Sequence, residues 1–191
     1  WAYCDPLGQP EKAISDFSRA IELNPKDADT WYERGLGYQK LGQYSQAIPD
    51  YSQAIELDPK SLKAWIMRGR AYSNSGQYDK ARADMQTVLK LAPASVASLN
   101  DLAWLLATCP DLELRDPSRA AELARQALGI ADRFGDVWNT LGVAQYRAGD
   151  AKAAVEALEK SMSLRNGGDA SDYLFLAMAH WQLNHKDEAR T

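Results

Sequence analysis

The sequence repeats itself every 34 residues, and no other feature restricts its fold as strongly. Three dipeptides that end in proline, Asn24-Pro25, Asp58-Pro59 and Ala92-Pro93, stand at this spacing. The same interval relates further matching residues: Trp31 and Trp65, Gly35 and Gly69, Tyr38 and Tyr72, Gly42 and Gly76, Tyr44 and Tyr78, and Ala47 and Ala81. A fixed period of this size is typical of solenoids, in which each repeat buries its apolar face only against its neighbours.

Each repeat predicts two helices separated by a short turn. Within residues 30–41 the large side chains recur at intervals of three or four, and so share one helical face. They are Trp31, Arg34, Tyr38 and Leu41. A residue that accepts the left-handed conformation then ends the helix. The residues at this position are Gly42, Gly76, Gly149 and, in the last repeat, Asn184. A second helix is expected over 44–57, and Pro59 prevents its continuation.

Composition agrees with an all-α fold. The chain contains 30 Ala and 22 Leu but only 16 Val, Ile and Thr together, so helix formers outnumber β-branched residues. A net charge of −4 argues against a nucleic-acid partner, and no apolar run is long enough for a membrane span. Cys4 and Cys109 lie far apart, without companions at metal-ligand spacing. We therefore expect free thiols in a reducing compartment, the cytoplasm, and no membrane partner.

The repeat pattern resembles that of the tetratricopeptide repeat family. That family has a large residue, a small pair, an aromatic, and alanines and a proline at fixed offsets over 34 residues. The resemblance implies an all-α fold, an α-solenoid in which antiparallel helix pairs form a right-handed superhelix. It divides the chain into a partial repeat 1 at 1–27, repeats 2 to 5 at 28–61, 62–95, 96–134 and 135–169, and a truncated repeat 6 at 170–191.

Two segments depart from the regular period. Repeat 4 is five residues too long, and the excess falls at 108–115, before Asp116-Pro117 restarts a helix. This insertion is either a contact site or a tolerated surface loop. Residues 166–169 replace the proline stop with a segment containing two glycines, which favours a hinge or bend. Neither end shows a polar capping surface, so we expect a piece of a longer protein, or ends covered by another subunit.

No motif predicts catalysis or cofactor binding. The sequence has no nucleophile turn, glycine-rich phosphate loop, zinc-protease helix or Cys-x-x-Cys pair. His180 and His185 are five residues apart and would not face one metal ion on a single helix. The sequence therefore predicts no enzyme, no cofactor and no metal site, and its function must come from the surface.

The resemblance implies that the first helices of successive repeats line a concave groove. Its residues, carried over position by position, are Tyr32, Leu36, Gln39, Lys63, Ile66 and Arg70 in repeats 2 and 3, then Asn100, Trp104, Asn139, Val143, Tyr146, Leu174, Met178 and Trp181 in repeats 4 to 6. The lysine–asparagine clamp of chaperone adaptors is incomplete here. Lys63 and Arg70 either hold one acidic side chain or form a solvated pair.

The principal contact site is expected in the C-terminal half of this groove. It has aromatic and methionine anchors, with two amides as hydrogen-bonding groups: Trp104, Tyr146, Met178, Trp181, Asn100 and Asn139. The alternative is that these residues form only the core between repeats. We expect a scaffold that binds a partly apolar peptide or partner helix, and not nucleic acid. The alternative functions are self-association through the uncapped ends, or a docking and regulatory arm of a larger multidomain signalling enzyme.

Two repeats carry charged residues at positions that are apolar elsewhere. Arg34 and Arg68 stand where the family usually has leucine, and Asp50 and Asp84 follow each of them 16 residues later. Later repeats replace the arginine by Leu102, Leu141 or Leu176, and the aspartate by Leu123 or Ala157. Because both positions change together, we predict two ion pairs, Arg34 with Asp50 and Arg68 with Asp84, between the helices of each repeat.

Overall fold

The computed structural model describes residues 10–185, and this range forms ten α-helices without a strand. The chain divides into two compact units, up to Ala92 and from Pro93. The first unit contains α1 (Pro10–Leu23), α2 (Ala28–Lys40), α3 (Tyr44–Leu57), α4 (Leu62–Asn74) and α5 (Tyr78–Leu91). The second unit contains α6 (Val96–Thr108), α7 (Pro117–Ile130), α8 (Gly135–Arg147), α9 (Ala151–Arg165) and α10 (Ala170–Gln182).

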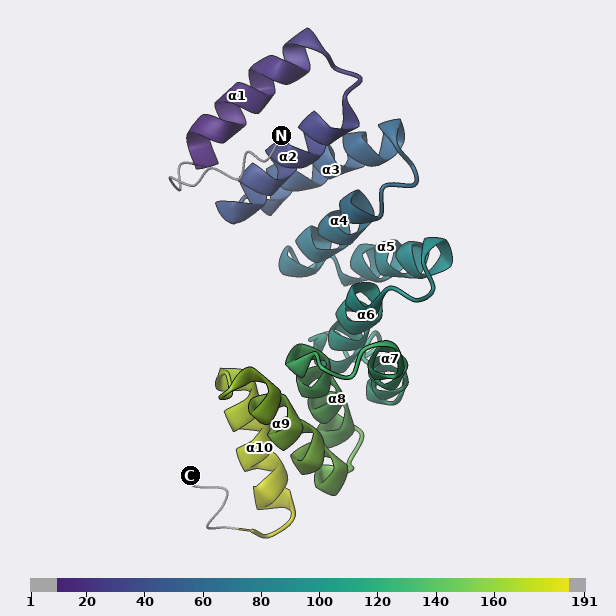
Figure 1. Ribbon diagram of the computed structural model, residues 1–191, viewed down its shortest axis with the longest axis vertical. Helices are drawn as coiled ribbons and strands as arrows, with labels where there is room; N and C mark the ends of the chain where they lie inside the picture. The colour runs from purple at the N-terminus through teal and green to yellow at the C-terminus, as the bar shows by residue number, and fades with distance from the viewer. Residues whose placement is uncertain (1–9, 186–191) are drawn as a thin grey trace. The chain divides into compact units, whose positions relative to one another are not determined.

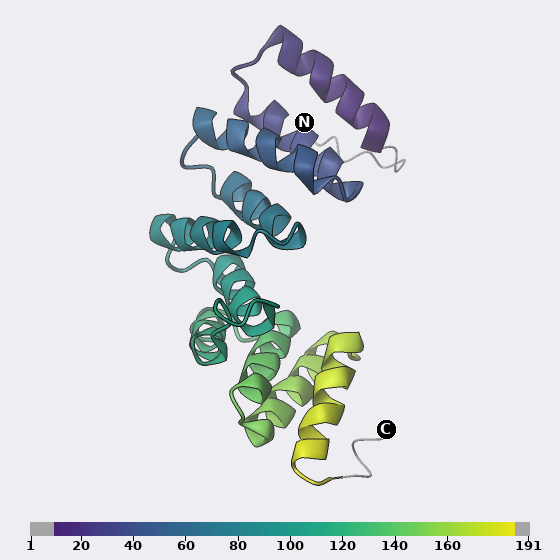
Figure 2. The same cartoon turned by 180° about the vertical axis from the view of Figure 1, so that it is seen from behind.

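Successive helices pack against one another within each unit, as antiparallel pairs joined by short turns (Figures 1 and 2). The helices α2, α4, α6, α8 and α10 begin at residues 28, 62, 96, 135 and 170, where the sequence placed the starts of repeats 2 to 6. In the second unit, α8 also contacts both α6 and α10. Within each unit the first helices of neighbouring repeats therefore lie side by side, α2 with α4 in the first unit and α8 with α6 and α10 in the second.

The helix ends follow the turn chemistry of the sequence. Gly42, Gly76 and Gly149 have φ angles of 70°, 78° and 89°, and Asn184 has 64°, so all four adopt the predicted left-handed conformation. At the restart after the insertion, the Asp116 side chain accepts a hydrogen bond from the backbone N–H of Arg119 at 2.9 Å. Aspartate is thus the N-cap of α7 and proline its first residue.

Small residues set the close approach of paired helices. A Cβ atom added at Gly35 of α2 would lie 2.7 Å from the Tyr51 ring of α3. In the second unit, a Cβ at Gly142 of α8 would lie 2.6 Å from Leu158 Cγ of α9. Both distances are far below van der Waals contact, so glycine at these crossings allows a large partner side chain to fill the core.

Both predicted ion pairs are present in the first unit. The Arg34 guanidinium donates two hydrogen bonds of 2.7 Å to Asp50, joining α2 to α3. Arg68 donates two bonds of 2.8 Å to Asp84, joining α4 to α5. Both aspartates are buried, so each carboxylate depends on its arginine for charge compensation.

Each of these arginines also bonds to the preceding helix and stacks on aromatic rings. Arg34 Nη1 donates to Ser18 Oγ of α1 at 3.2 Å, and Arg68 Nη1 donates to Ser52 Oγ of α3 at 3.1 Å. The guanidinium carbon of Arg68 lies 4.7 Å from the Trp65 ring and 5.7 Å from the Tyr72 ring. A partly buried arginine in this unit therefore connects three consecutive helices.

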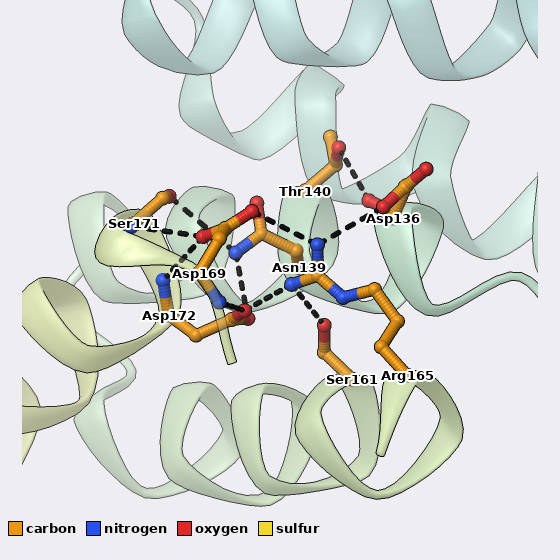
Figure 3. A network of polar contacts seen from close by, with 8 residues as sticks. All are labelled: Asp136, Asn139, Thr140, Ser161, Arg165, Asp169, Ser171 and Asp172. Atoms are coloured by element: carbon orange, nitrogen blue, oxygen red, sulfur yellow. Dashed lines mark hydrogen bonds and ion pairs between the residues drawn. The ribbon is translucent and has the colours of Figure 1, made fainter. Parts of the chain in front are cut away.

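The turn between α9 and α10 holds a different polar network (Figure 3). Arg165 donates to the carboxylates of Asp136, Asp169 and Asp172, and also to Ser161 Oγ. Asp169 and Asp172 form a capping box at the start of α10. The segment predicted as a hinge is thus bonded to the helices on both sides of it.

Candidate protein-interaction surface

The predicted groove residues of the first unit are largely engaged with one another. Lys63 Nζ lies 2.6 Å from Asp29 Oδ1 and 4.6 Å from the Tyr32 ring centroid. The hydrogen bond to Asp29 raises the pKa of Lys63. Gln39 Oε1 accepts a 3.0 Å hydrogen bond from the Tyr51 hydroxyl. Tyr32 and Leu36 pack on the core of α2, α3 and α4, Ile66 is half-buried, and Arg70 is exposed.

Two predicted groove residues in the second unit are not accessible to a partner. Val143 is completely buried, and Asn139 is only 5% exposed. Asn139 Nδ2 donates to Asp172 Oδ1 at 2.8 Å and to Ser171 Oγ at 3.4 Å, which fixes α8 to α10. The prediction that Asn139 and Val143 face a ligand is therefore wrong. The neighbouring helix α10 covers this part of α8, and its Asp172 side chain accepts a hydrogen bond from the Asn139 amide.

The aromatic anchors are more exposed than a core assignment allows. Trp181 of α10 is 62% exposed and Trp104 of α6 is 38% exposed, so neither is packed as an ordinary core residue. Asn100, one turn before Trp104, has a buried Oδ1 atom without a hydrogen-bond partner in the described part of the chain. Of the six residues of the expected contact site, Trp104, Met178 and Trp181 are thus exposed, Asn100 and Tyr146 are half-buried, and Asn139 is buried.

A hollow of about 420 Å³ lies in the second unit between α8, α10 and the insertion of repeat 4. We call it the α8–α10 hollow. It is lined by Tyr146, Arg147, Leu174, Phe175, Met178 and Arg115. Three of these, Tyr146, Leu174 and Met178, are residues that the sequence placed in the groove. Leu174 is 57% exposed. The rings of Tyr146 and Phe175 pack edge to face, with their centroids 5.6 Å apart.

Sequence reasoning missed the two arginines of this hollow. Arg115 belongs to the insertion, and its Nε donates a hydrogen bond of 2.8 Å to the Cys109 carbonyl. This bond connects the end of the insertion to its beginning. Arg147 ends α8, with its guanidinium carbon 5.7 Å from the Phe175 ring. Burial, and then the charge of Arg115, lower the pKa of Arg147. The five extra residues of repeat 4 were the sequence feature that could have indicated Arg115, because the insertion places this arginine beside α8.

The described residues contain no grouping suited to a metal ion. No cluster of three or more His, Cys, Asp or Glu side chains in residues 10–185 could hold a metal ion. Cys109 is a buried free thiol, and Cys4 lies outside the described residues. His180 and His185 do not share one helix, because α10 ends at Gln182, and the left-handed turn at Asn184 brings their Nδ1 atoms to 3.4 Å. No helix in the described range is both long and apolar enough to cross a membrane.

Helix pairs repeated along the chain, each packed on its neighbours, define an α-solenoid, a class of protein that offers the surface of its repeats for binding. The chain belongs to the tetratricopeptide repeat family. Family models described as tetratricopeptide repeats match residues 28–61, 51–83 and 110–169, and one described as a TPR repeat matches 6–42. No curated protein matches the sequence.

Solved structures of other repeat proteins share the fold. MamA from Desulfovibrio magneticus RS-1 aligns at 22% identity with a TM-score of 0.73, over 83% of this chain and 87% of that one. A chain of the Cut9-Hcn1 hetero-tetramer of APC/C aligns at 20% identity and 0.80, over 96% of this chain and 35% of that one. YrrB, described as a TPR protein with an unusual peptide-binding site, aligns at 18% and 0.69, over 92% and 88%.

Proposed function

We propose that this protein is an interaction scaffold that binds a partly apolar peptide or partner helix in its second unit, at the α8–α10 hollow. The observation that carries the proposal is a hollow lined by the exposed side chains of Leu174 and Met178 and by the rings of Tyr146 and Phe175. Flexible and aromatic side chains of this kind are favoured as interface anchors. Trp181, which lies further along α10, adds another exposed apolar side chain to the same helix.

The first unit supports binding less well. Its groove side chains already make contacts within the unit, as Lys63 does with Asp29 and Gln39 with Tyr51. A ligand there would have to replace these contacts, which reduces the net gain in binding free energy. The description of YrrB as peptide-binding gives a precedent within the fold.

The test is selection of ligands from a random peptide library displayed on phage, with the whole chain as bait. Fluorescence polarisation then gives the Kd of an enriched peptide for variants. We expect Leu174→Ala and Met178→Ala to weaken binding by about 10-fold or more, as anchors do. The matched control is Ile130→Ala in α7, which is 51% exposed but lies outside the hollow and is expected to bind normally.

Two outcomes would contradict the proposal. One is that the library yields no peptide that binds the chain above background. The other is that Lys63→Ala in the first unit abolishes binding while Leu174→Ala leaves the Kd unchanged. The second result would move the contact site to α4.

Exposed aromatic residues on α10 favour self-association as a second candidate function. Tyr173 and Trp181 are 51% and 62% exposed on the same helix. Light scattering over a range of concentrations measures the mass of the particle. A mass that rises with concentration and falls back in Trp181→Ala would support this candidate, and a constant monomer mass would reject it.

A further inference from the structure

We infer that Arg115 and Arg147 hold a carboxylate of the bound partner, so that the ligand of the α8–α10 hollow carries an acidic side chain among apolar ones. This inference rests on the proposed function and adds the charge of the ligand to it. Its basis is that both guanidinium groups line a hollow whose other walls are Tyr146, Leu174, Phe175 and Met178.

These two arginines differ from the other partly buried arginines of the chain. Six arginines in residues 10–185 are half-buried. Four of them pair with an aspartate of the same chain, namely Arg34, Arg68, Arg82 and Arg165. Within the described range, neither Arg115 nor Arg147 has a carboxylate partner. A cation that is shielded from water is stabilised by an opposite charge. The other four half-buried arginines each have an aspartate for this purpose, and among the described residues the hollow has no carboxylate beside its two arginines.

The two charges also act on each other. The like charge of Arg115 adds to burial in lowering the pKa of Arg147. Both guanidinium groups carry a positive charge. A carboxylate placed between them would relieve this repulsion and accept charge-assisted hydrogen bonds, which are about twice as strong as neutral ones.

The contacts of Arg115 leave donors for a ligand. Its Nε bonds to the Cys109 carbonyl at 2.8 Å, and Nη2 lies 3.5 Å from the Pro110 carbonyl. These contacts fix the guanidinium plane, while Nη1 makes no hydrogen bond to the described residues. A donor that is positioned before binding loses little conformational entropy when the ligand arrives. The insertion of repeat 4 then has the role of a contact site.

The occupant is a peptide, since the apolar walls need a ligand with apolar side chains beside its charge. A hollow of about 420 Å³ accommodates a few side chains. A purely anionic ligand would leave Leu174 and Met178 without apolar contacts, and a purely apolar one would bury the arginines without compensation. The net charge of −4 disfavours acidic peptides in general, so a preference for acidic peptides would indicate a local group of cations, which the two arginine variants then locate.

The experiment repeats the phage selection with the whole chain and two variants, Arg147→Gln and Arg125→Gln. Arg125 is an exposed arginine of α7 in the same unit and serves as the matched control. We expect the natural chain and Arg125→Gln to enrich peptides with Asp or Glu among apolar residues, and Arg147→Gln to lose the acidic preference. Circular dichroism checks that each variant folds, and Arg115→Gln provides a second, independent removal of charge.

One enriched peptide and its Glu→Gln or Asp→Asn counterpart then give the size of the effect. We expect the natural chain to bind the acidic form about 10-fold or more tightly, and Arg147→Gln to bind both forms equally. Enrichment of apolar peptides without an acid would overturn this inference and leave the proposed function standing. Failure to enrich any peptide would overturn both, and equal acid preference in Arg147→Gln would overturn the role of the arginines.

Discussion

The two units solve the same packing problem with different side chains. In the first unit, the space between the helices of a repeat holds Arg68 with Asp84. At the matching positions the second unit has Leu102 with Leu123, and all four of these positions are shielded from solvent. The backbone pattern of paired helices is the same in both. The helix pair therefore does not need the ion pair to form, and the charged version adds geometric specificity at the cost of desolvation.

The difference also changes where charge is placed. Arg34 and Arg68 of the first unit turn inward and are neutralised by aspartates on the next helix. In the second unit, Arg165 is neutralised at the α9–α10 turn, and Arg115 and Arg147 line the hollow. The second unit thus combines an apolar repeat core with two cations that line a hollow at its surface.

The largest expected effect comes from breaking one inward pair. Arg68→Leu leaves Asp84 buried without its counter-ion and also removes the stacking on Trp65 and Tyr72, so we expect a loss of about 3–5 kcal/mol in unfolding free energy. Urea unfolding followed by circular dichroism gives the loss. Hydrogen exchange should place it in α4 and α5.

A double-mutant cycle completes this comparison. Arg68→Leu combined with Asp84→Leu copies the leucine pair of the second unit, and we expect it to lie within about 1 kcal/mol of the natural chain. Direct pairing requires the loss in the double variant to be much smaller than the sum of the two single losses. Simple additivity would show that the residues act independently.

The repeats and their ion pairs could be predicted because they follow from local spacing. The 34-residue period fixes where helices begin, the left-handed residues Gly42 and Asn184 fix where they end, and two positions that change together reveal the pairs. The serine partners Ser18 and Ser52 carry the same period and were available to this reasoning.

The candidate site could be predicted only in part. Tyr146, Leu174 and Met178 were found because they follow the family positions. Asn139 and Val143 follow the same rule but are buried, since packing of α10 on α8 decides exposure and periodicity does not. Arg115 was missed because its position depends on the path of a non-repeating loop.

A smaller effect is expected at the polar network of the α9–α10 turn (Figure 3). Arg165→Met removes the donor to the fully buried Asp172, which keeps bonds from Asn139 and from the backbone N–H of Asp169. Because those bonds remain, we expect a loss of about 1–3 kcal/mol. Hydrogen exchange should show lower protection of the backbone amides in α10 and unchanged protection in α4. Equal loss of protection in both helices would mean that the two units unfold together.

The smallest effect tests the charge of the α10 N-cap. Burial raises the pKa of Asp169, but the backbone N–H of Asp172 and the Arg165 guanidinium outweigh it, so the net pKa is lower than the ordinary 3.8. The folded state therefore gains stability above the ordinary value and loses it as the pH falls through the folded pKa. The residue is half-exposed, so we expect less than about 1 kcal/mol.

Asp169→Asn isolates this charge, because asparagine is an equally good N-cap. The variant should be less stable than the natural chain at about pH 6 and equal to it at about pH 2, where both side chains are neutral. Carbon NMR of the Asp169 carboxyl should give a pKa below 3.8 that moves upward in Arg165→Met. A stability difference that is the same at both pH values would show that Asp169 stabilises the start of α10 through its cap geometry and not through its charge, in contrast to the charged pairs of the first unit.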